Sequence, residues 1–257
     1  MIKIKNATKV ASLLSALVLS AGAQATIVEF QTSQQSFKVN LYDTQVPETV
    51  ANFLKYIEAN RYDESVIHRA IPQFIIQGGG IGYDAEDKLA NIETFAAVKN
   101  EPKYSNVRGT ISMAKIPNSP NSATSQWFIN LKDNSAELDV QNSGYTVFGE
   151  VIDSGMNVVD QISGLTRCGE VPVINFSDEQ CSNADIKPAK ENLVVVYSVK
   201  VLDNDPNTAA SLSPKENTLI KNVEKPSTDN GSSSGGSLYF ALLMLASSVI
   251  GRRFGRA

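Results

Sequence analysis

The stretch Val66-Ile-His-Arg-Ala-Ile-Pro-Gln-Phe-Ile-Ile-Gln-Gly-Gly-Gly80 holds two short apolar runs joined at Pro72. Both runs, residues 66–71 and 74–77, are rich in isoleucine, and they predict two β-strands. The three glycines that follow fit a turn, because neither a Gly-Lys-Ser/Thr sequence nor a strand–GxGxxG–helix context accompanies them. The stretch therefore predicts a strand pair in which Arg69 and Gln77 stand out against an apolar background.

Outward from this stretch, further segments show strand-like or helical periodicity. A helix is predicted from Pro47 to about Asn60, because Val50, Phe53 and Ile57 recur at helical spacing behind an N-terminal proline. A second helix is predicted over residues 156–162. The other predicted strands are residues 27–32, 37–41, 109–114, 126–131, 146–152 and 193–202. Eight short strands with two helices predict a mainly β fold, a closed antiparallel barrel that leaves no exposed edge.

Two of these stretches closely resemble the signatures of the cyclophilin family. The first resembles FHRxIPxFMxQGG, and Gly109-Thr-Ile-Ser-Met-Ala114 with Asn121-Ser-Ala-Thr-Ser-Gln-Trp-Phe-Ile-Asn130 resembles GxxSMA…SQFFI. Residues 145–151 and 155–159 are similar to the later VFGxV and GMxVV elements, so the resemblance runs from about residue 27 to 202. It implies an eight-stranded barrel capped by two helices and the activity of a peptidyl-prolyl cis–trans isomerase.

The resemblance also implies roles for individual residues. Arg69 matches the catalytic arginine, Gln77 the glutamine that orients it, and Phe128 the aromatic floor of the proline pocket. The other matched substrate-binding positions are Phe74, Ile75, Ala114, Lys115, Gln126, Leu138 and Tyr145. Taken singly, the apolar members are more often core residues and an arginine is more often ion-paired. Only the joint spacing of these residues favours a site.

Three departures from the family pattern bear on function. Ile75 replaces the usual methionine, and Lys115 replaces a common asparagine. Glu137 stands where relatives carry an aromatic residue that commonly contacts cyclosporin, and Trp127 lies on a neighbouring strand and does not replace it. Lys115 and Glu137 keep open the alternative of a non-catalytic module that binds proline-containing segments. A further alternative is a surface scaffold in which the barrel only presents the C-terminal tether.

Other chemistries find little support in the sequence. His68 is the single histidine, no GxSxG motif accompanies it, and it is expected to be structural. No metal-ligand spacing or cofactor motif occurs, so neither a metal nor a cofactor is expected. Proline-containing polypeptides are the expected substrates, and the chain is expected to act as a monomer.

The first 25 residues predict a secretory signal. Lys3, Lys5 and Lys9 precede an apolar run, and Ala23-Gln24-Ala25 fits a cleavage site, although a buried N-terminal helix is the alternative. The isomerase domain is then expected over residues 26–203. Export places it in the periplasm or on the surface of a Gram-negative bacterium.

The C-terminal part predicts a linker and a sorting or anchor segment. Residues 204–236 are rich in Asn, Ser, Pro, Thr, Lys and Gly, which is typical of a disordered tether. Residues 237–257 contain a short apolar run followed by Arg252, Arg253 and Arg256, and with Gly235-Gly236 they resemble a GlyGly-CTERM sorting signal. That resemblance implies cleavage by a rhomboid-type protease. The alternative is a permanent membrane anchor.

The net charge and the two cysteines predict which partners are disfavoured and how the chain is stabilised. The formal net charge is −4, and without the three lysines before residue 26 and the three arginines after residue 236 it is about −10, which disfavours nucleic acid as a partner. Cys168 and Cys181 are the two cysteines, and export predicts a disulfide between them, with two free thiols as the alternative. Because no signature residue lies between them, loss of the bond is expected to lower stability while sparing most of the activity.

Overall fold

The computed structural model describes residues 26–203 and 208–223. The predicted signal segment, residues 1–25, and the predicted sorting segment, residues 237–257, lie outside the described residues. The same is true of residues 204–207 and 224–236 of the predicted linker.

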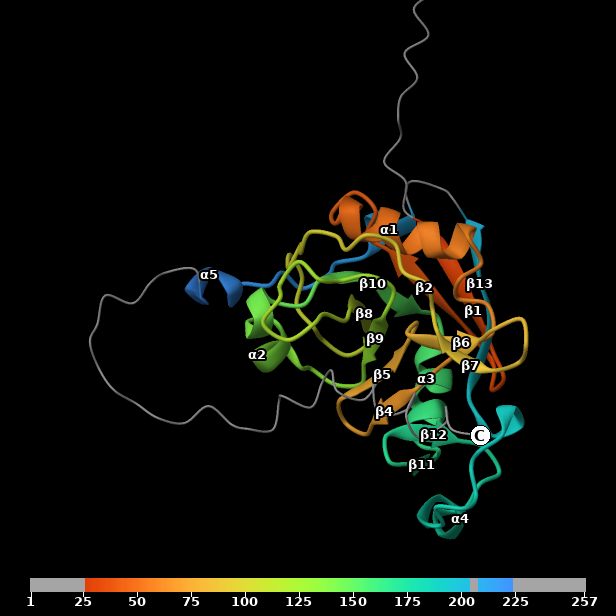
Figure 1. Ribbon diagram of the computed structural model, residues 1–257. Coiled ribbons are helices and arrows are strands. Elements are labelled where there is room, and N and C mark those ends of the chain that lie inside the picture. Colours follow the sequence, from red (N-terminus) through yellow and green to blue (C-terminus); the bar gives the residue numbers. More distant parts are fainter. Residues whose placement is uncertain (1–25, 204–207, 224–257) are drawn as a thin grey trace, which may run out of the picture.

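The body of the protein is one curled, mainly antiparallel sheet (Figure 1). Its eleven strands follow the order β4-β5-β9-β8-β10-β2-β1-β13-β3-β6-β7, and β11 and β12 form a separate hairpin. In chain order the strands are β1 (Ile27–Thr32), β2 (Ser36–Leu41), β3 (Ser65–Val66), β4 (Arg69–Ile71), β5 (Ile75–Gly78), β6 (Ile81–Tyr83), β7 (Leu89–Asn91), β8 (Thr110–Met113), β9 (Trp127–Asn130), β10 (Val147–Ile152), β11 (Thr166–Cys168), β12 (Val171–Val173) and β13 (Val195–Asp203).

The predicted strands are present, but eight is too low a number. The predicted strand at residues 66–71 divides into β3 and β4, which pair with different neighbours. Four further strands, β6, β7, β11 and β12, were not predicted. Each is three residues long, and so short a segment shows no clear alternation of apolar and polar residues.

Two helices cover the sheet, as predicted, and lie at different ends of it (Figure 1). The first is α1 (Pro47–Glu58), which begins with Pro47 and buries Val50, Phe53 and Ile57. The second is α3 (Gly155–Ser163), which buries Val158, Val159 and Ile162. Two shorter helices, α2 (Ser135–Leu138) and α4 (Asp178–Ser182), lie in connections that the sequence left unassigned, and a third, α5 (Ile220–Val223), lies in the predicted disordered linker.

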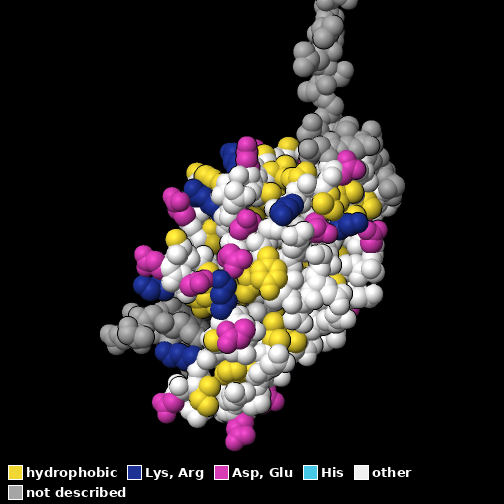
Figure 2. All heavy atoms as spheres, turned by 90° about the vertical axis from the view of Figure 1, so that its right-hand side faces the viewer, with side chains coloured by type: hydrophobic (Ala, Val, Ile, Leu, Met, Phe, Trp, Pro, Cys, Tyr) yellow, Lys and Arg dark blue, Asp and Glu magenta, His cyan; other side chains and the backbone are white. Residues whose placement is uncertain are grey.

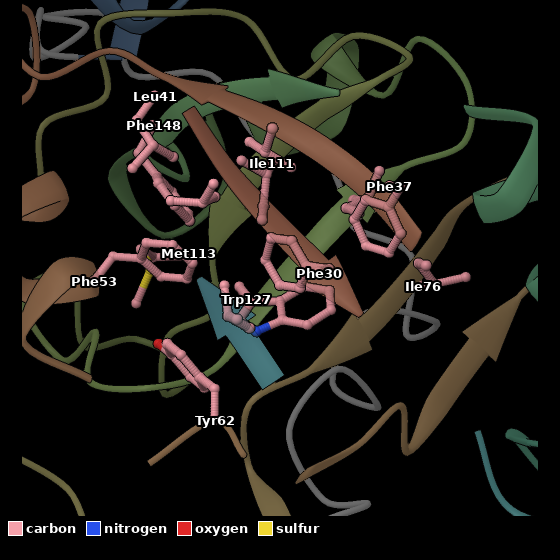
Figure 3. Close-up of a cluster of buried hydrophobic side chains, with 14 of the residues drawn as sticks. Phe30, Phe37, Leu41, Phe53, Tyr62, Ile76, Ile111, Met113, Trp127 and Phe148 are labelled. Carbon is pink, nitrogen blue, oxygen red and sulfur yellow. The ribbon is translucent and has the colours of Figure 1, made fainter. Parts of the chain in front are cut away.

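Aromatic side chains fill the space that the sheet encloses (Figure 3). Phe30 stacks on Phe37 with ring centroids 4.8 Å apart, and Trp127 meets Phe30 edge-on at 5.0 Å. Phe53 of α1 contacts Phe148 of β10 at 5.0 Å, so the helix is joined to the same cluster. Such ring pairs stabilise the fold beyond the area they bury. Because this core packs against one face of β5, β8 and β9, the opposite face of these strands is left for the site.

Part of the predicted linker packs on the domain. The amide of Asn217 donates to the carbonyl of Lys103, its side chain donates to the carbonyl of Asp139, and it is 4% exposed. Glu216 forms a β-bridge with Tyr104. This segment is therefore attached to the body and is not a free tether, because its backbone is hydrogen-bonded to residues 103–105.

The described surface is mixed in charge. Figure 2 shows acidic and basic side chains interspersed on one face, with small apolar areas between them. Among the helices of residues 26–203 and 208–223, none has the length and apolar character needed to cross a bilayer.

Candidate active site

Arg69, Gln77 and Phe128 occupy one row across three strands. Arg69 of β4 lies opposite Gln77 of β5, and Gln77 lies opposite Phe128 of β9. The row continues to Ser112 of β8. Residues in register on neighbouring antiparallel strands point to the same face. The fold therefore brings together the three residues that the resemblance implies are catalytic.

An apolar cluster separate from the main core lies beside this row. It contains five buried side chains, with Phe74 packed against them from the rim. The five are Ile75, Ala114, Phe128, Leu138 and Tyr145. Phe128 and Tyr145 meet edge-on with ring centroids 5.7 Å apart. These six residues are all predicted pocket residues, and the structure places them together although they come from five separate segments.

The guanidinium of Arg69 is held on two sides. Its Nη1 donates to Oε1 of Gln77 at 3.3 Å. Its Nε donates to Oε2 of Glu170 at 2.6 Å, and its Nη2 lies 3.5 Å from Oε1 of the same carboxylate. Arg69 is 2% exposed, so its charge needs a partner. Glu170 supplies that partner, which no pattern in the sequence indicates.

Gln126 extends this chain of hydrogen bonds. Gln77 Nε2 donates to Oε1 of Gln126 at 2.8 Å, so Arg69, Gln77 and Gln126 are joined by consecutive hydrogen bonds. Gly80 makes room for Gln126, because a Cβ at residue 80 would lie 2.7 Å from the Gln126 side chain. Gly79 has a φ of +74°, which favours glycine. The glycine run is thus a bend that lets Gln126 approach.

Lys115 departs from its predicted role at the rim. Its Nζ donates to the carbonyl oxygens of Asn142 at 2.8 Å and Gly144 at 2.7 Å, and it lies 4.9 Å from the centre of the Tyr145 ring. The side chain is 1% exposed. The ammonium therefore holds the loop before Tyr145 in place through hydrogen bonds. Its buried position keeps it from reaching a substrate.

Glu137 lies exposed in α2, next to the buried Leu138 of the pocket. The chain thus carries an exposed carboxylate at the position where the resemblance implies an aromatic residue.

The predicted disulfide between Cys168 and Cys181 is present, and the segment that it encloses contacts a predicted site residue. Glu170 lies between the two cysteines in sequence and contacts Arg69. The segment enclosed by the bond therefore reaches the site, because the β11–β12 hairpin folds back onto β4. The hairpin thus links the disulfide to Arg69, and the effect of the bond on activity stays a prediction.

Two buried bases predict how stability depends on pH. Burial lowers the pKa of His68 to about 4, and burial lowers the pKa of Lys115 to about 7. In each case the unfolded chain holds the proton at higher pH than the folded chain does. The free energy of unfolding should therefore rise with pH from about 4 to 6.5 for His68 and from about 7 to 10.5 for Lys115.

Denaturant titrations of the chain between pH 4 and 9 measure this dependence. The slope for one proton is at most about 1.4 kcal/mol per pH unit. Lys115→Met should flatten the curve between pH 7 and 9 and leave the acid limb in place. A Lys115→Met curve as steep as that of the unmodified chain above pH 7 would contradict the assignment.

The described residues contain no group of three or more His, Cys, Asp or Glu side chains placed to hold a metal ion. The row itself offers hydrogen bonding by a fixed guanidinium beside an apolar cluster.

Comparison with known proteins agrees with this geometry. The family model for cyclophilin type peptidyl-prolyl cis-trans isomerase/CLD matches residues 27–186. A peptidyl-prolyl cis-trans isomerase of Acinetobacter baylyi is 42% identical over 195 residues, which are 74% of this chain and 96% of the relative. Peptidyl-prolyl cis-trans isomerase B of Escherichia coli is 41% identical over 145 residues, 54% of this chain and 85% of the relative.

A solved structure shows the same fold. The crystal structure of a Cryptosporidium parvum cyclophilin type peptidyl-prolyl cis-trans isomerase superposes with a TM-score of 0.51 at 21% identity, covering 70% of this chain and 99% of that one. At this identity the likeness concerns the fold alone. With the family match over more than half of the chain, these findings show that the chain belongs to the cyclophilin-type peptidyl-prolyl cis–trans isomerases and is an isomerase that acts on proline-containing polypeptides.

Proposed function

We propose that isomerisation takes place over the row of Arg69, Gln77 and Phe128, with the prolyl ring in the apolar cluster around Phe128. The observation that carries this proposal is a buried arginine, held by Gln77 and Glu170, in one row with Phe128 of the apolar cluster. A planar X–Pro bond keeps partial double-bond character, and its rotation must cross a barrier of about 18–20 kcal/mol. Uncatalysed exchange takes tens to hundreds of seconds.

Arg69 would lower this barrier by favouring the twisted state. As the bond twists, the prolyl nitrogen loses conjugation and becomes a better hydrogen-bond acceptor. A guanidinium donor near that nitrogen then binds the twisted state more strongly than either planar state, and each ~1.4 kcal/mol of that preference is tenfold in rate. The pocket holds the ring while the preceding residue rotates, and Gln126 offers polar contacts to the substrate backbone.

Nuclear magnetic resonance tests the location of the site. The ¹⁵N-labelled chain would be titrated with a short Ala-Pro peptide under exchange conditions. We expect the side-chain signals of Arg69, Gln77 and Gln126 to shift and broaden, while Arg108, which pairs with Asp160, stays unchanged. Shifts confined to a different surface would refute the proposed groove.

Weak inhibition by cyclosporin is expected from the exposed carboxylate of Glu137. An apolar ligand that covers Glu137 must desolvate the carboxylate without giving it a partner, which is costly. Glu137→Trp should therefore tighten inhibition about tenfold or more. Glu179→Trp in α4, which adds the same ring elsewhere, is the control. Nanomolar inhibition of the unmodified chain would contradict the expectation.

We also propose that the isomerase is exported and held transiently at the membrane through residues 237–257. The order of basic, apolar and small residues in 1–25 supports export. The basic cluster after the C-terminal apolar run favours an orientation with the domain outside the cytoplasm. A rhomboid-type sorting protease is the proposed partner, and the periplasm or cell surface of a Gram-negative bacterium is the proposed location.

Cleavage near Gly235-Gly236 is the testable consequence. The apolar run from Leu238 to Ile250 is shorter than the ~20 residues that usually span a bilayer. Protein recovered from producing cells should have an intact mass that lacks Arg252, Arg253 and Arg256. A mass that retains all three, in membrane fractions only, would establish a permanent anchor.

We further propose that the sheet closes into a barrel and that the chain is a monomer. The segment from β3 to β4 supports closure, because Ile67 donates to the carbonyl of Val194 while His68 donates to that of Gln77. One continuous segment thus pairs with β13 through its first half and with β5 through its second. The pocket is built from one chain, which supports a monomer.

A further inference from the structure

The β11–β12 hairpin places a carboxylate against Arg69. Cys168 pairs with Val171, so Gly169 and Glu170 form a two-residue turn. Gly169 has a φ of +69°, and a Cβ at this position would meet nothing within 4 Å. Glycine is therefore favoured here by the backbone conformation and not by a lack of space. A two-residue hairpin with positive φ at its first central position matches the twist of the flanking strands. Glu170 is thereby held in a defined position at the tip.

The tip holds β4 through both backbone and side chain. The carbonyl oxygen of Glu170 accepts from the amide of Ala70 at 2.6 Å, next to Arg69 in sequence. Its carboxylate accepts from Nε of Arg69 at 2.6 Å and lies 3.5 Å from Nη2. Hydrogen bonds between a guanidinium and a carboxylate are about twice as strong as neutral ones and define an orientation.

These contacts determine which donors of Arg69 remain for substrate. A guanidinium has five N–H donors. Glu170 occupies the Nε side and Gln77 takes a donor of Nη1, so the plane of the group is set from two directions. An arginine side chain has many rotamers, and losing one of two anchors would release it to sample them. A misplaced guanidinium donor forms a weaker hydrogen bond to the prolyl nitrogen as the X–Pro bond twists, so it lowers the barrier less.

We propose that Glu170 is a positioning residue for Arg69, which sets the orientation in which the guanidinium meets the twisted X–Pro bond. The inference rests on the proposed role of Arg69. The arginine side chain is 3% exposed and the Glu170 side chain 37%, so the carboxylate reaches the arginine from the solvent side. An ion pair that only stabilised the fold would change stability and leave turnover unchanged.

Three variants of the full chain separate these roles. Glu170→Gln keeps the shape and an acceptor oxygen but removes the charge, and Glu170→Ala removes both. Glu179→Gln in α4 removes an exposed carboxylate from the same disulfide-enclosed segment and is the matched control. Isomerisation of an Ala-Pro peptide would be measured as kcat and KM separately, with thermal unfolding followed in parallel.

We expect Glu170→Ala to lower kcat about tenfold with KM within about twofold. Glu170→Gln should fall between this variant and the unmodified chain, and Glu179→Gln should match the unmodified chain. The Arg69 Nε–H resonance should move and broaden in Glu170→Ala. If that variant fails to fold, the same comparison rests on Glu170→Gln, which conserves the side-chain volume.

Unchanged kcat and an unchanged Arg69 resonance in a folded Glu170 variant would overturn the inference. This outcome is distinguishable from failure of the proposed function. If Arg69→Ala abolishes activity while Glu170→Ala is fully active, only the positioning role of Glu170 is lost. If Arg69→Ala is itself fully active, the proposed role of the arginine is lost as well.

Discussion

Arg69→Ala is expected to lower kcat/KM for an X–Pro peptide by about 10²–10³-fold, the usual loss when one well-placed transition-state donor is removed. The physical reason is that Arg69 is the cation in contact with Gln77 at the edge of the pocket. Substrate affinity should change less than turnover, since the apolar cluster around Phe128 is left intact. Glu170, which loses its partner, is partly exposed and can be hydrated, so the variant should fold.

The measurement is the rate of cis–trans exchange, with circular dichroism as a check on folding. Arg69→Lys keeps the charge and loses the planar fork, so it should recover only a small part of the activity. Arg108→Ala removes another ion-paired arginine, that of the Arg108–Asp160 bridge, and should leave the rate unchanged. A folded and fully active Arg69→Ala protein would refute the mechanism.

Removing the disulfide is expected to have the second largest effect. In the double variant Cys168→Ser/Cys181→Ser the unfolded chain gains freedom over a loop of 13 residues, which should lower the free energy of unfolding by about 3 kcal/mol. The rate should fall as well, because the hairpin that carries Glu170 loses one of its attachments. The result would reverse the expectation from sequence that activity is spared.

Denaturant unfolding and the exchange assay on the same samples test both parts. Ser182→Ala in α4 is the control, because it changes a side chain beside Cys181 and keeps the bond. A double-serine variant with unchanged turnover and lower stability would limit the disulfide to a structural role. Such a result would leave the contact between Glu170 and Arg69 to be tested by the Glu170 variants.

The sequence predicted well wherever one element has a regular pattern. β1 has the predicted bounds, and α1 begins at Pro47 as its N-terminal proline and apolar spacing require. The short strands β6 and β7 fall in what the sequence presents as a loop. Three residues give too little alternation to recognise, and these strands form because neighbouring strands supply their hydrogen bonds.

The candidate site divides in the same way. The resemblance of two sequence stretches to the cyclophilin signatures singled out Arg69, Gln77 and Phe128, and the register of β4, β5 and β9 then places them in one row. Glu170 could not be found, because it lies 101 residues from Arg69 and no pattern links the two. The sequence also did not indicate where the Lys115 side chain points, since its partners lie in a loop 27 and 29 residues further along the chain.

The sequence by itself thus determined the family, through its resemblance to the cyclophilin signatures, and the longer regular elements. Both depend on local order along the chain, which a linear sequence displays directly. Only the tertiary structure decided that a disulfide-bonded hairpin braces Arg69 and that Lys115 supports the Tyr145 loop. Those contacts join side chains across long separations, and burial makes them necessary, because a charge removed from water must find a partner wherever the fold places one.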